Sequence, residues 1–125
     1  MYKLLIIDDD KSMTNPVKYF FEMRNYNVDV AHNGKDGLNC IRDSKPDIVF
    51  LDIGLPDMSG LEVLEKIREN DRHMKVVLMS GYNKADKIKK AQSLGISEYI
   101  QKPLTLECLE ETTNRIEKEL LEENK

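Results

Sequence analysis

Residues 47–60 read Asp-Ile-Val-Phe-Leu-Asp-Ile-Gly-Leu-Pro-Asp-Met-Ser-Gly, and this stretch decides the fold. Its apolar run, Ile48–Leu51, is typical of a strand buried on both faces, as in a parallel sheet. The run ends in a carboxylate, Asp52, just before Gly54 and Pro56 interrupt the pattern. Because open α/β sheets bind ligands at the carboxyl ends of their strands, Asp52 is either a functional acid or merely the residue that begins a turn.

The composition is that of one soluble globular domain. A length of 125 residues suits a single hydrophobic core, so we expect one domain over residues 1–125. The net charge of −4 argues against direct binding of nucleic acid. Cys40 and Cys108 belong to no CxxC or Cys/His cluster, which favours a reducing, cytoplasmic location without a zinc site or disulfide. No apolar run approaches the roughly 20 residues of a transmembrane helix, and we find no signal peptide.

Alternating strand and helix patterns predict the architecture. The predicted strands are Lys3–Ile7, Val28–Ala31, Asp47–Asp52, Lys75–Met79 and Ser97–Gln101, and the predicted helices after the first run over about Lys35–Asp43, Gly60–Asn70, Lys84–Leu94 and from Leu106 onward. Parallel strands require helical crossovers, and these are right-handed. We therefore predict an α/β fold with a doubly wound five-stranded parallel sheet flanked by five helices.

The first helix has two candidate starting points. With Asn15 as the N-cap, Pro16 would occupy the first helical position, where a missing N–H does least harm. If the helix instead begins at Ser12, Pro16 falls just past the first turn and should kink or loosen it. The sequence leaves both boundaries open.

The helix predicted over Lys84–Leu94 has a thin apolar stripe. Ile88 and Ala91 are nearly all that it can bury, and lysines occupy much of the rest of its surface. Little apolar area then holds the helix against the sheet. We expect it to be mobile.

Chemically useful groups follow four of the five predicted strands. Asp8 and Asp9 end the first strand, Asp52 the third, Ser80 the fourth and Lys102 the fifth. Because the carboxyl ends of parallel strands share one edge, these side chains should meet there. Taken alone, the acidic triplet could be a solvated loop, Ser80 a common strand-ending residue and Lys102 a surface lysine. Their combination is what indicates a functional site.

Crowded carboxylates predict a metal ion. Three acids within a few ångströms repel one another, and a divalent cation relieves that repulsion. Oxygen ligands suit Mg²⁺, which binds one or two carboxylates together with waters and a phosphate, whereas zinc would favour His or Cys. A carboxylate can also attack phosphorus to form an aspartyl phosphate, a reaction that mainly requires positioning and charges that offset the phosphoryl oxygens. The metal ion and Lys102 would supply those charges, and Ser80 would give a hydroxyl to a phosphoryl oxygen.

Five motifs occur in a characteristic order: Ile-Ile-Asp-Asp-Asp (6–10), Asp-Ile-Val-Phe-Leu-Asp (47–52), Leu-Pro-Asp-Met-Ser-Gly (55–60), Leu-Met-Ser-Gly (78–81) and Tyr-Ile-Gln-Lys-Pro-Leu (99–104). In these motifs the chain resembles the receiver domains of bacterial two-component response regulators. The resemblance runs from about Lys3 into the last helix. It implies a signalling domain rather than an enzyme, one that assists its own phosphorylation and dephosphorylation.

The resemblance also implies roles for individual residues. Asp52 would be the phosphoacceptor, Asp8 and Asp9 the acids on the metal side, Ser80 the hydroxyl that senses the phosphoryl group, and Lys102 its cationic partner. Tyr99 matches the switch aromatic of the family. Lys102-Pro103 matches a peptide bond that the family usually holds cis. The implied switch surface comprises the fourth helix, the fifth strand and the fifth helix.

Three positions depart from the usual family pattern or are variable in it. Gly54 stands where the family lends a backbone carbonyl to the metal and where the side chain influences phosphate lifetime, so metal binding should survive while the lifetime cannot be predicted. Tyr82, two residues after Ser80, gives no prediction of the phosphate lifetime either. Gly81 stands where the family more usually has alanine, and the smaller residue should leave the site at least as open.

Two other classes of protein share parts of this pattern. A flavodoxin-like cofactor binder has the same topology but needs a Ser/Thr/Gly-rich phosphate loop, whereas here Asp8–Lys11 would repel a phosphate. An aspartate-nucleophile phosphatase usually carries a second acid two residues after the nucleophile, where this chain has Gly54. A degenerate receiver that binds partners without being phosphorylated would lack a site residue, and here Asp9, Asp52, Ser80 and Lys102 are all present.

The implied partners follow from the resemblance. They are a sensor histidine kinase or phosphotransfer protein as donor, and an output domain or downstream protein as target. A phosphorylation-dependent homodimer is a further expected partner. The sequence does not identify the kinase, the stimulus or the output, nor whether the chain acts alone or as the amino-terminal part of a longer regulator.

Overall fold

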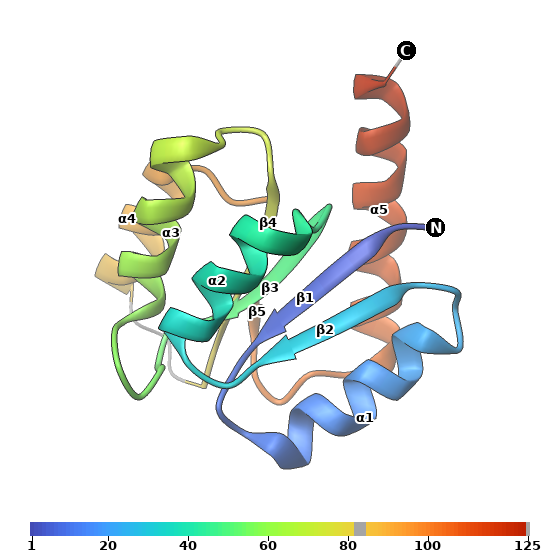
Figure 1. Cartoon of the computed structure of the whole chain (residues 1–125), viewed down its shortest axis with the longest axis horizontal. Coiled ribbons are helices and arrows are strands. Elements are labelled where there is room, and N and C mark those ends of the chain that lie inside the picture. Colours follow the sequence, from blue (N-terminus) through green and yellow to red (C-terminus); the bar gives the residue numbers. More distant parts are fainter. Residues whose placement is uncertain (82–84, 125) are drawn as a thin grey trace.

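The computed structural model describes residues 1–81 and 85–124, and within these ranges five strands form one sheet that five helices cover (Figure 1). The strands are β1 (Lys3–Ile7), β2 (Asn27–Ala31), β3 (Ile48–Asp52), β4 (Lys75–Ser80) and β5 (Glu98–Gln101). The helices are α1 (Lys11–Glu22), α2 (Gly34–Ser44), α3 (Gly60–Asn70), α4 (Ala85–Leu94) and α5 (Leu106–Glu123). The predicted α/β architecture is confirmed.

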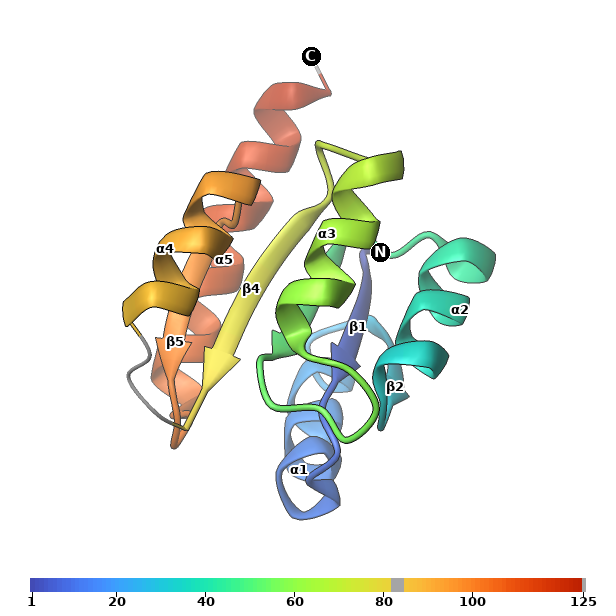
Figure 2. The same ribbon diagram turned by 90° about the vertical axis from the view of Figure 1, so that its left-hand side faces the viewer.

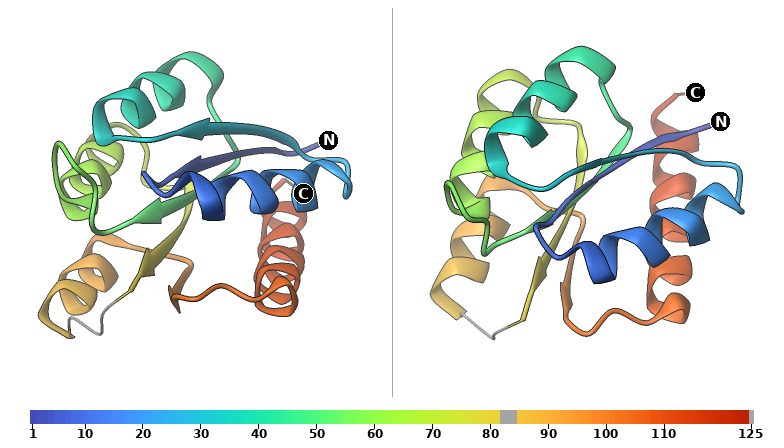
Figure 3. Two further views of the ribbon diagram at one scale, coloured as in Figure 1. Left: turned by 90° about the horizontal axis from the view of Figure 1, so that it is seen from below. Right: turned by 60° about the horizontal axis from the view of Figure 1, so that its bottom comes forward.

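The sheet has the strand order β2-β1-β3-β4-β5, and every neighbouring pair is parallel. In this register Ile7 lies beside both Ala31 and Leu51, so β1, β2 and β3 end nearly level. The carboxyl ends of all five strands therefore open onto one edge, which comes forward in the right-hand view of Figure 3. The residues that end β3 and β4 or directly follow β1 and β5 are the ones that the sequence singles out.

Side chains alternate between two hydrophobic cores because successive residues of a strand point to opposite faces. On β1, Leu4 and Ile6 pack on the side of α1 and α5, whereas Leu5 and Ile7 pack on the side of α2, α3 and α4. Figure 2 shows these two helical layers on either side of the sheet. Both faces are thus buried, which explains the nearly continuous apolar runs of the central strands.

The first helix begins earlier than the Asn15 interpretation predicts. Asp10 is the N-cap, and its carboxylate accepts a hydrogen bond from Ser12 N at 3.0 Å. Pro16 lies inside the helix, which nonetheless continues to Glu22. The proline removes one backbone hydrogen bond, while burial of Val17 and Phe21 holds the helix on the sheet. Asn15 as N-cap is therefore wrong, and the alternative start at Ser12 is correct to within one residue.

The fourth helix carries little buried surface, as the sequence indicates. Ala91 is fully buried and Ile88 half-buried. Its predicted first residue, Lys84, lies outside the described residues, and the helix is described from Ala85. The expected mobility of this helix stays a prediction.

Candidate functional site

Three acids meet at the carboxyl edge of the sheet. Carboxylate oxygens of Asp8, Asp9 and Asp52 lie within 4.8 Å of one another. Asp8 is fully buried, Asp52 is 6% exposed, and Asp9 is exposed to solvent. All three offer hard oxygen donors on the wall of a partly open site, a donor set that fits Mg²⁺ with some of its waters retained.

Backbone pairing explains how two of these acids become neighbours. β1 and β3 lie side by side, and Asp8 directly follows β1 while Asp52 is the last residue of β3. Asp8 N extends the ladder by donating to Ala31 O at 3.0 Å. The chain then turns, and Asp10 N donates to the Asp8 carboxylate at 3.0 Å. The Asp8 side chain is thereby fixed before any ligand binds.

Lys102 provides the positive charge of the site. Its Nζ lies 2.5 Å from Asp8 Oδ2 and 3.5 Å from Asp52 Oδ2. Lys102 N donates to Ser80 O at 2.8 Å, which continues the pairing of β5 with β4 past the end of the strand. The Lys102-Pro103 peptide bond is cis, as the family resemblance implies. Lys102 thus bridges the first and third strand ends from the fifth.

The electrostatics of the site oppose ionisation of Asp52. Burial, together with the charge of Asp8, raises the pKa of Asp52, and Lys102 offsets only part of that rise. Burial alone would lower the pKa of Lys102, but its hydrogen bond to Asp8 and the charge of Asp52 raise it overall. Cationic Lys102 therefore stands beside Asp52 and offsets only part of what raises the pKa of that carboxyl group.

Ser80 and Tyr99 lie on neighbouring strands. Ser80 is the last residue of β4, is 3% exposed and pairs with Gln101 of β5. Tyr99 sits two residues before the end of β5, is half-buried and packs against the core beneath α2, α3 and α4. It also lines a groove of about 490 Å³ beside α5. The structure therefore brings Ser80 to the edge with the acids, and it places Tyr99 on β5 two residues before the end of that strand.

The two glycines of the site occupy open positions. Gly54 N donates to Asp52 Oδ1 at 3.3 Å, and Gly54 pairs with Ser59 across the β3–α3 loop. A Cβ added at Gly81 would meet no heavy atom within 4 Å, so the alanine common at this position would also fit. Tyr82, the third departure noted in the sequence, lies outside the described residues.

Two contacts at this edge escape sequence analysis. His32 Nδ1 lies 3.0 Å from Asp8 O, and because a carbonyl only accepts, Nδ1 carries the proton. Asp57 accepts hydrogen bonds from the first turn of α2. His32 could have been found from topology, since it directly follows the second predicted strand. Nothing in the sequence indicates the partner of Asp57.

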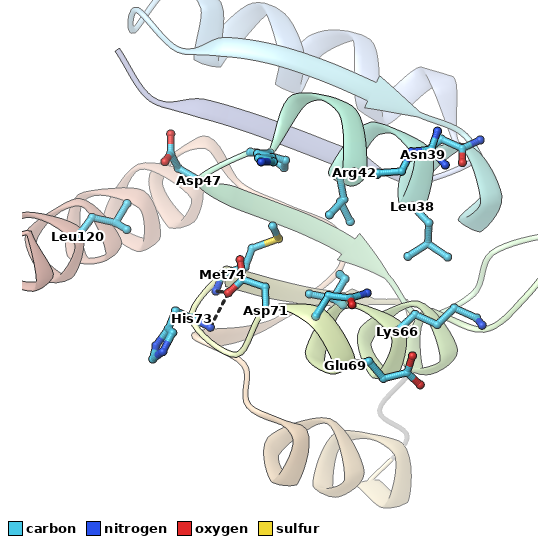
Figure 4. Close-up of a pocket in the computed structure, with 15 residues that line it drawn as sticks. Leu38, Asn39, Arg42, Asp47, Lys66, Glu69, Asp71, His73, Met74 and Leu120 are labelled. Carbon is cyan, nitrogen blue, oxygen red and sulfur yellow. Dashed lines mark hydrogen bonds between the residues drawn. The ribbon is translucent and has the colours of Figure 1, made fainter.

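A larger groove lies away from the acids. It has a volume of about 910 Å³ and is lined by α2, α3 and the segments that precede β3 and β4 (Figure 4). Leu38 and Met74 contribute apolar surface, and Asp71 accepts a hydrogen bond from His73 N at 2.8 Å. The groove therefore lies toward the amino-terminal edge of the sheet, opposite the carboxylates.

The strand order and the acids and lysine at the carboxyl edge define a class, the receiver-type α/β signalling domain. The chain belongs to the response regulator receiver domain family, whose model matches residues 4–114. It is 38% identical over 106 residues to the chemotaxis protein CheY of Treponema pallidum, covering 82% of this chain and 74% of that one.

Solved receiver domains have the same fold. A CheY-like receiver domain protein from Methanospirillum hungatei superposes with a TM-score of 0.91 at 29% identity, covering 98% of each chain. A two-component response regulator from Clostridium difficile gives 0.91 at 32% identity, covering 96% of this chain and 98% of that chain. The chain is therefore a receiver domain of two-component signal transduction. The flavodoxin-like and phosphatase alternatives find no support in these matches.

The relatives differ in length. The chain spans 42% of the transcriptional regulatory protein TrcR of Mycobacterium tuberculosis, to which it is 32% identical over 107 residues. It spans 91% of the sporulation initiation phosphotransferase F of Bacillus subtilis, at 27% identity over 113 residues. Among the described helices, none is both long and apolar enough to cross a bilayer.

Proposed function

We propose that Asp52 accepts a phosphoryl group in a Mg²⁺-dependent reaction. The observation that carries this proposal is the cluster itself: Asp52 lies beside Asp8 and Asp9, and Lys102 Nζ is 3.5 Å from its carboxylate. The carboxylates of Asp8, Asp9 and Asp52 and the backbone carbonyl of Gly54 would hold the ion. When bound, Mg²⁺ would offset the negative charge of the phosphoryl oxygens.

The residues of the chain have distinct parts in this reaction. An Asp52 oxygen forms a bond to phosphorus while the bond from phosphorus to the donor breaks, and an imidazole leaving group takes up a proton from solvent. The donor is the phosphohistidine of a sensor kinase or phosphotransfer protein, or a small acyl phosphate. Lys102 stabilises the phosphoryl oxygens by its charge, and the rigid strand end keeps Asp52 aligned for attack. The domain thus assists its own phosphorylation and, with water as attacking group, its dephosphorylation.

The readout proceeds through Ser80 and Tyr99. New phosphoryl oxygens attract the Ser80 hydroxyl by a charge-assisted hydrogen bond, and Tyr99 moves into the vacated space. α4, which buries little apolar surface, follows. Because a ligand shifts an equilibrium only by its differential affinity for two states, some active form exists before phosphorylation. The simpler alternative is that Tyr99 only packs at the sheet edge.

Amide hydrogen exchange with and without beryllofluoride, an acyl-phosphate mimic, distinguishes these two roles of Tyr99. A switch requires protection changes from the end of β4 through α4 and β5, and these should weaken in Ser80→Ala. Changes confined to the β3–α3 loop would contradict the switch.

The family membership supports the remaining assignments. The whole of residues 1–125 forms one receiver domain, which works in the cytoplasm. Its partners are a histidine kinase or phosphotransfer protein and an output domain or downstream protein. Phosphorylation promotes a homodimer. The net charge of −4 indicates that this segment does not itself bind nucleic acid.

Intact-protein mass spectrometry after incubation with acetyl phosphate tests the phosphorylation. We expect addition of one phosphoryl group with Mg²⁺, none with excess EDTA and none in Asp52→Asn. Asp10→Asn is the matched control, since it removes a nearby carboxylate while leaving a residue that also caps helices. Equal modification of the Asp52→Asn variant and the wild type would overturn the assignment of Asp52.

A further inference from the structure

The β3–α3 loop is fastened to α2 by one side chain. Asp57 Oδ1 accepts from Gly34 N at 2.7 Å, and Asp57 Oδ2 accepts from Lys35 N at 3.0 Å. These are the first two residues of α2, whose amide groups have no partner within the helix. Both hydrogen bonds lower the pKa of Asp57, so the carboxylate is ionised and favourably placed at the positive end of the helix dipole.

Close packing accompanies this tether. A Cβ added at Gly34 would lie 2.5 Å from Met58 Cγ and 3.1 Å from Val63 Cγ2. The Met58 side chain of the loop therefore lies directly against the backbone of α2, and a side chain at position 34 would have to displace it. Met58 also packs on the core beneath α2, α3 and α4. Polar and apolar contacts together fix the loop at residues 57 and 58.

The same loop is closed on itself beside the phosphoacceptor. Gly54 pairs with Ser59, and Gly60 N donates to Ile53 O at 2.7 Å. Ser59 in turn caps α3 by accepting from Glu62 N. These contacts link the segment around Asp57 to Gly54, whose amide donates to the Asp52 carboxylate.

From this geometry we infer that Asp57 is a positioning residue for the metal site. It touches neither the phosphoryl group nor the ion. By holding the β3–α3 loop on α2, it keeps the Gly54 carbonyl where the ion needs it, beside the carboxylates of Asp8, Asp9 and Asp52. The inference rests on the proposed Mg²⁺ site.

Asp57→Ala and Asn33→Ala form a matched pair that separates positioning from plain helix capping. Asn33 is the N-cap of α2 and accepts from Asp36 N at 2.8 Å. Its loss weakens the same helix end but leaves the Asp57 hydrogen bonds in place. Both substitutions should lower thermal stability, whereas only Asp57→Ala should release the loop.

The readout is Mg²⁺ affinity, measured by MgCl₂ titration of ¹⁵N-labelled protein followed at the Gly54 and Gly60 amides. We expect Asp57→Ala to raise the apparent Kd for Mg²⁺ about tenfold, the low end of the usual cost of losing an outer-shell hydrogen bond at a metal site. Its acetyl-phosphate reaction should slow at low Mg²⁺ and recover at saturating Mg²⁺. Asn33→Ala should bind Mg²⁺ as the wild type does.

Two further variants keep the inference testable if Asp57→Ala does not fold. Asp57→Asn retains one acceptor oxygen and should give a smaller rise in the Kd. Gly34→Ala pushes on Met58 from the helix side with Asp57 intact, and should raise the Kd as well.

Each outcome has a distinct meaning. Unchanged Mg²⁺ affinity in folded Asp57 variants, beside normal wild-type binding, would overturn the inference alone. An equal loss of affinity in Asn33→Ala would also overturn it, since capping of α2 would then be the cause. A wild type that binds no Mg²⁺ would overturn the proposed function and this inference with it.

Discussion

Replacing Asp52 with Asn should stabilise the metal-free protein. Burial and the neighbouring Asp8 raise the pKa of Asp52 above its ordinary value. The folded state therefore binds the Asp52 proton more tightly than the unfolded state, whose carboxyl has a pKa of about 3.9. By linkage, stability falls as pH rises from that value through the folded-state pKa, and the loss is complete above it. Asn removes the carboxylate and with it this loss.

The distances set the size of the effect. At an effective dielectric constant of about 20, Asp8 at no more than 4.8 Å repels Asp52 by at least about 3.5 kcal/mol, while Lys102 at 3.5 Å attracts it by about 5 kcal/mol. These contributions offset to within roughly 2 kcal/mol, and repulsion by the exposed Asp9 narrows the difference. The cost of burying the charged Asp52 carboxylate then determines whether the substitution raises or lowers the free energy of unfolding. We expect Asp52→Asn to raise the free energy of unfolding of the metal-free protein by about 1–3 kcal/mol at pH 7.

Urea unfolding followed by circular dichroism, in EDTA, measures this gain across pH. The gain should be larger at pH 7 than in acid and should disappear as Asp52 of the wild type becomes protonated. Lys102, whose pKa is raised, stays charged throughout this window and does not contribute to the slope. Asp10→Asn is the control, because the hydrogen bond from Ser12 lowers the pKa of the exposed Asp10 and its loss should bring no gain. A less stable Asp52→Asn variant at pH 7, or a gain independent of pH, would refute this reasoning.

Three other variants test the fold and the site. Lys102→Met leaves the buried Asp8 without its cation and should lower the free energy of unfolding by about 3 kcal/mol in EDTA. Mg²⁺ should restore part of this stability. An unchanged midpoint of urea unfolding would contradict a stabilising role of the ion pair. Phe50→Ala, in the core facing α1 and α5, should cost about 3–5 kcal/mol by the same assay, and a loss below 1 kcal/mol would show that the cavity collapses. Arg68→Met removes the guanidinium that donates to Gly95 O at 2.8 Å, just after α4, and should speed amide hydrogen exchange in α4. Unchanged exchange in α4 would show that this hydrogen bond does not hold the helix in place.

Much of the architecture could be predicted because its signals are local. Apolar runs ending in polar residues marked β1, β3 and β4. The alternation of strand and helix patterns then indicated a parallel sheet. That topology alone brought Asp8, Asp52, Ser80 and Lys102 to one edge. The start of α1 was harder, because two local rules competed: Pro16 favours a first-turn position, while Asp10 caps the helix and buried Val17 and Phe21 carry it past the proline.

Contacts between separate segments were beyond prediction from the sequence. The Asp57 carboxylate reaches amides 22 and 23 residues away, and its aim depends on the path of the whole β3–α3 loop. The close pairing of Lys102 with Asp8 rather than Asp52 also could not be predicted, because the strand order places β3, which ends at Asp52, nearer to β5 than β1. Such side-chain geometry is set by packing, which periodicity does not encode.

The most direct test of the phosphoacceptor is to locate the phosphoryl group chemically. Protein incubated with acetyl phosphate and Mg²⁺ is treated with borohydride, which reduces an acyl phosphate to the alcohol, and the modified residue is then identified by peptide sequencing in a mass spectrometer. Reduction should occur at Asp52 and be absent when EDTA is present or acetyl phosphate is omitted. Reduction at Asp8 or Asp57 with Asp52 unmodified would contradict the assignment.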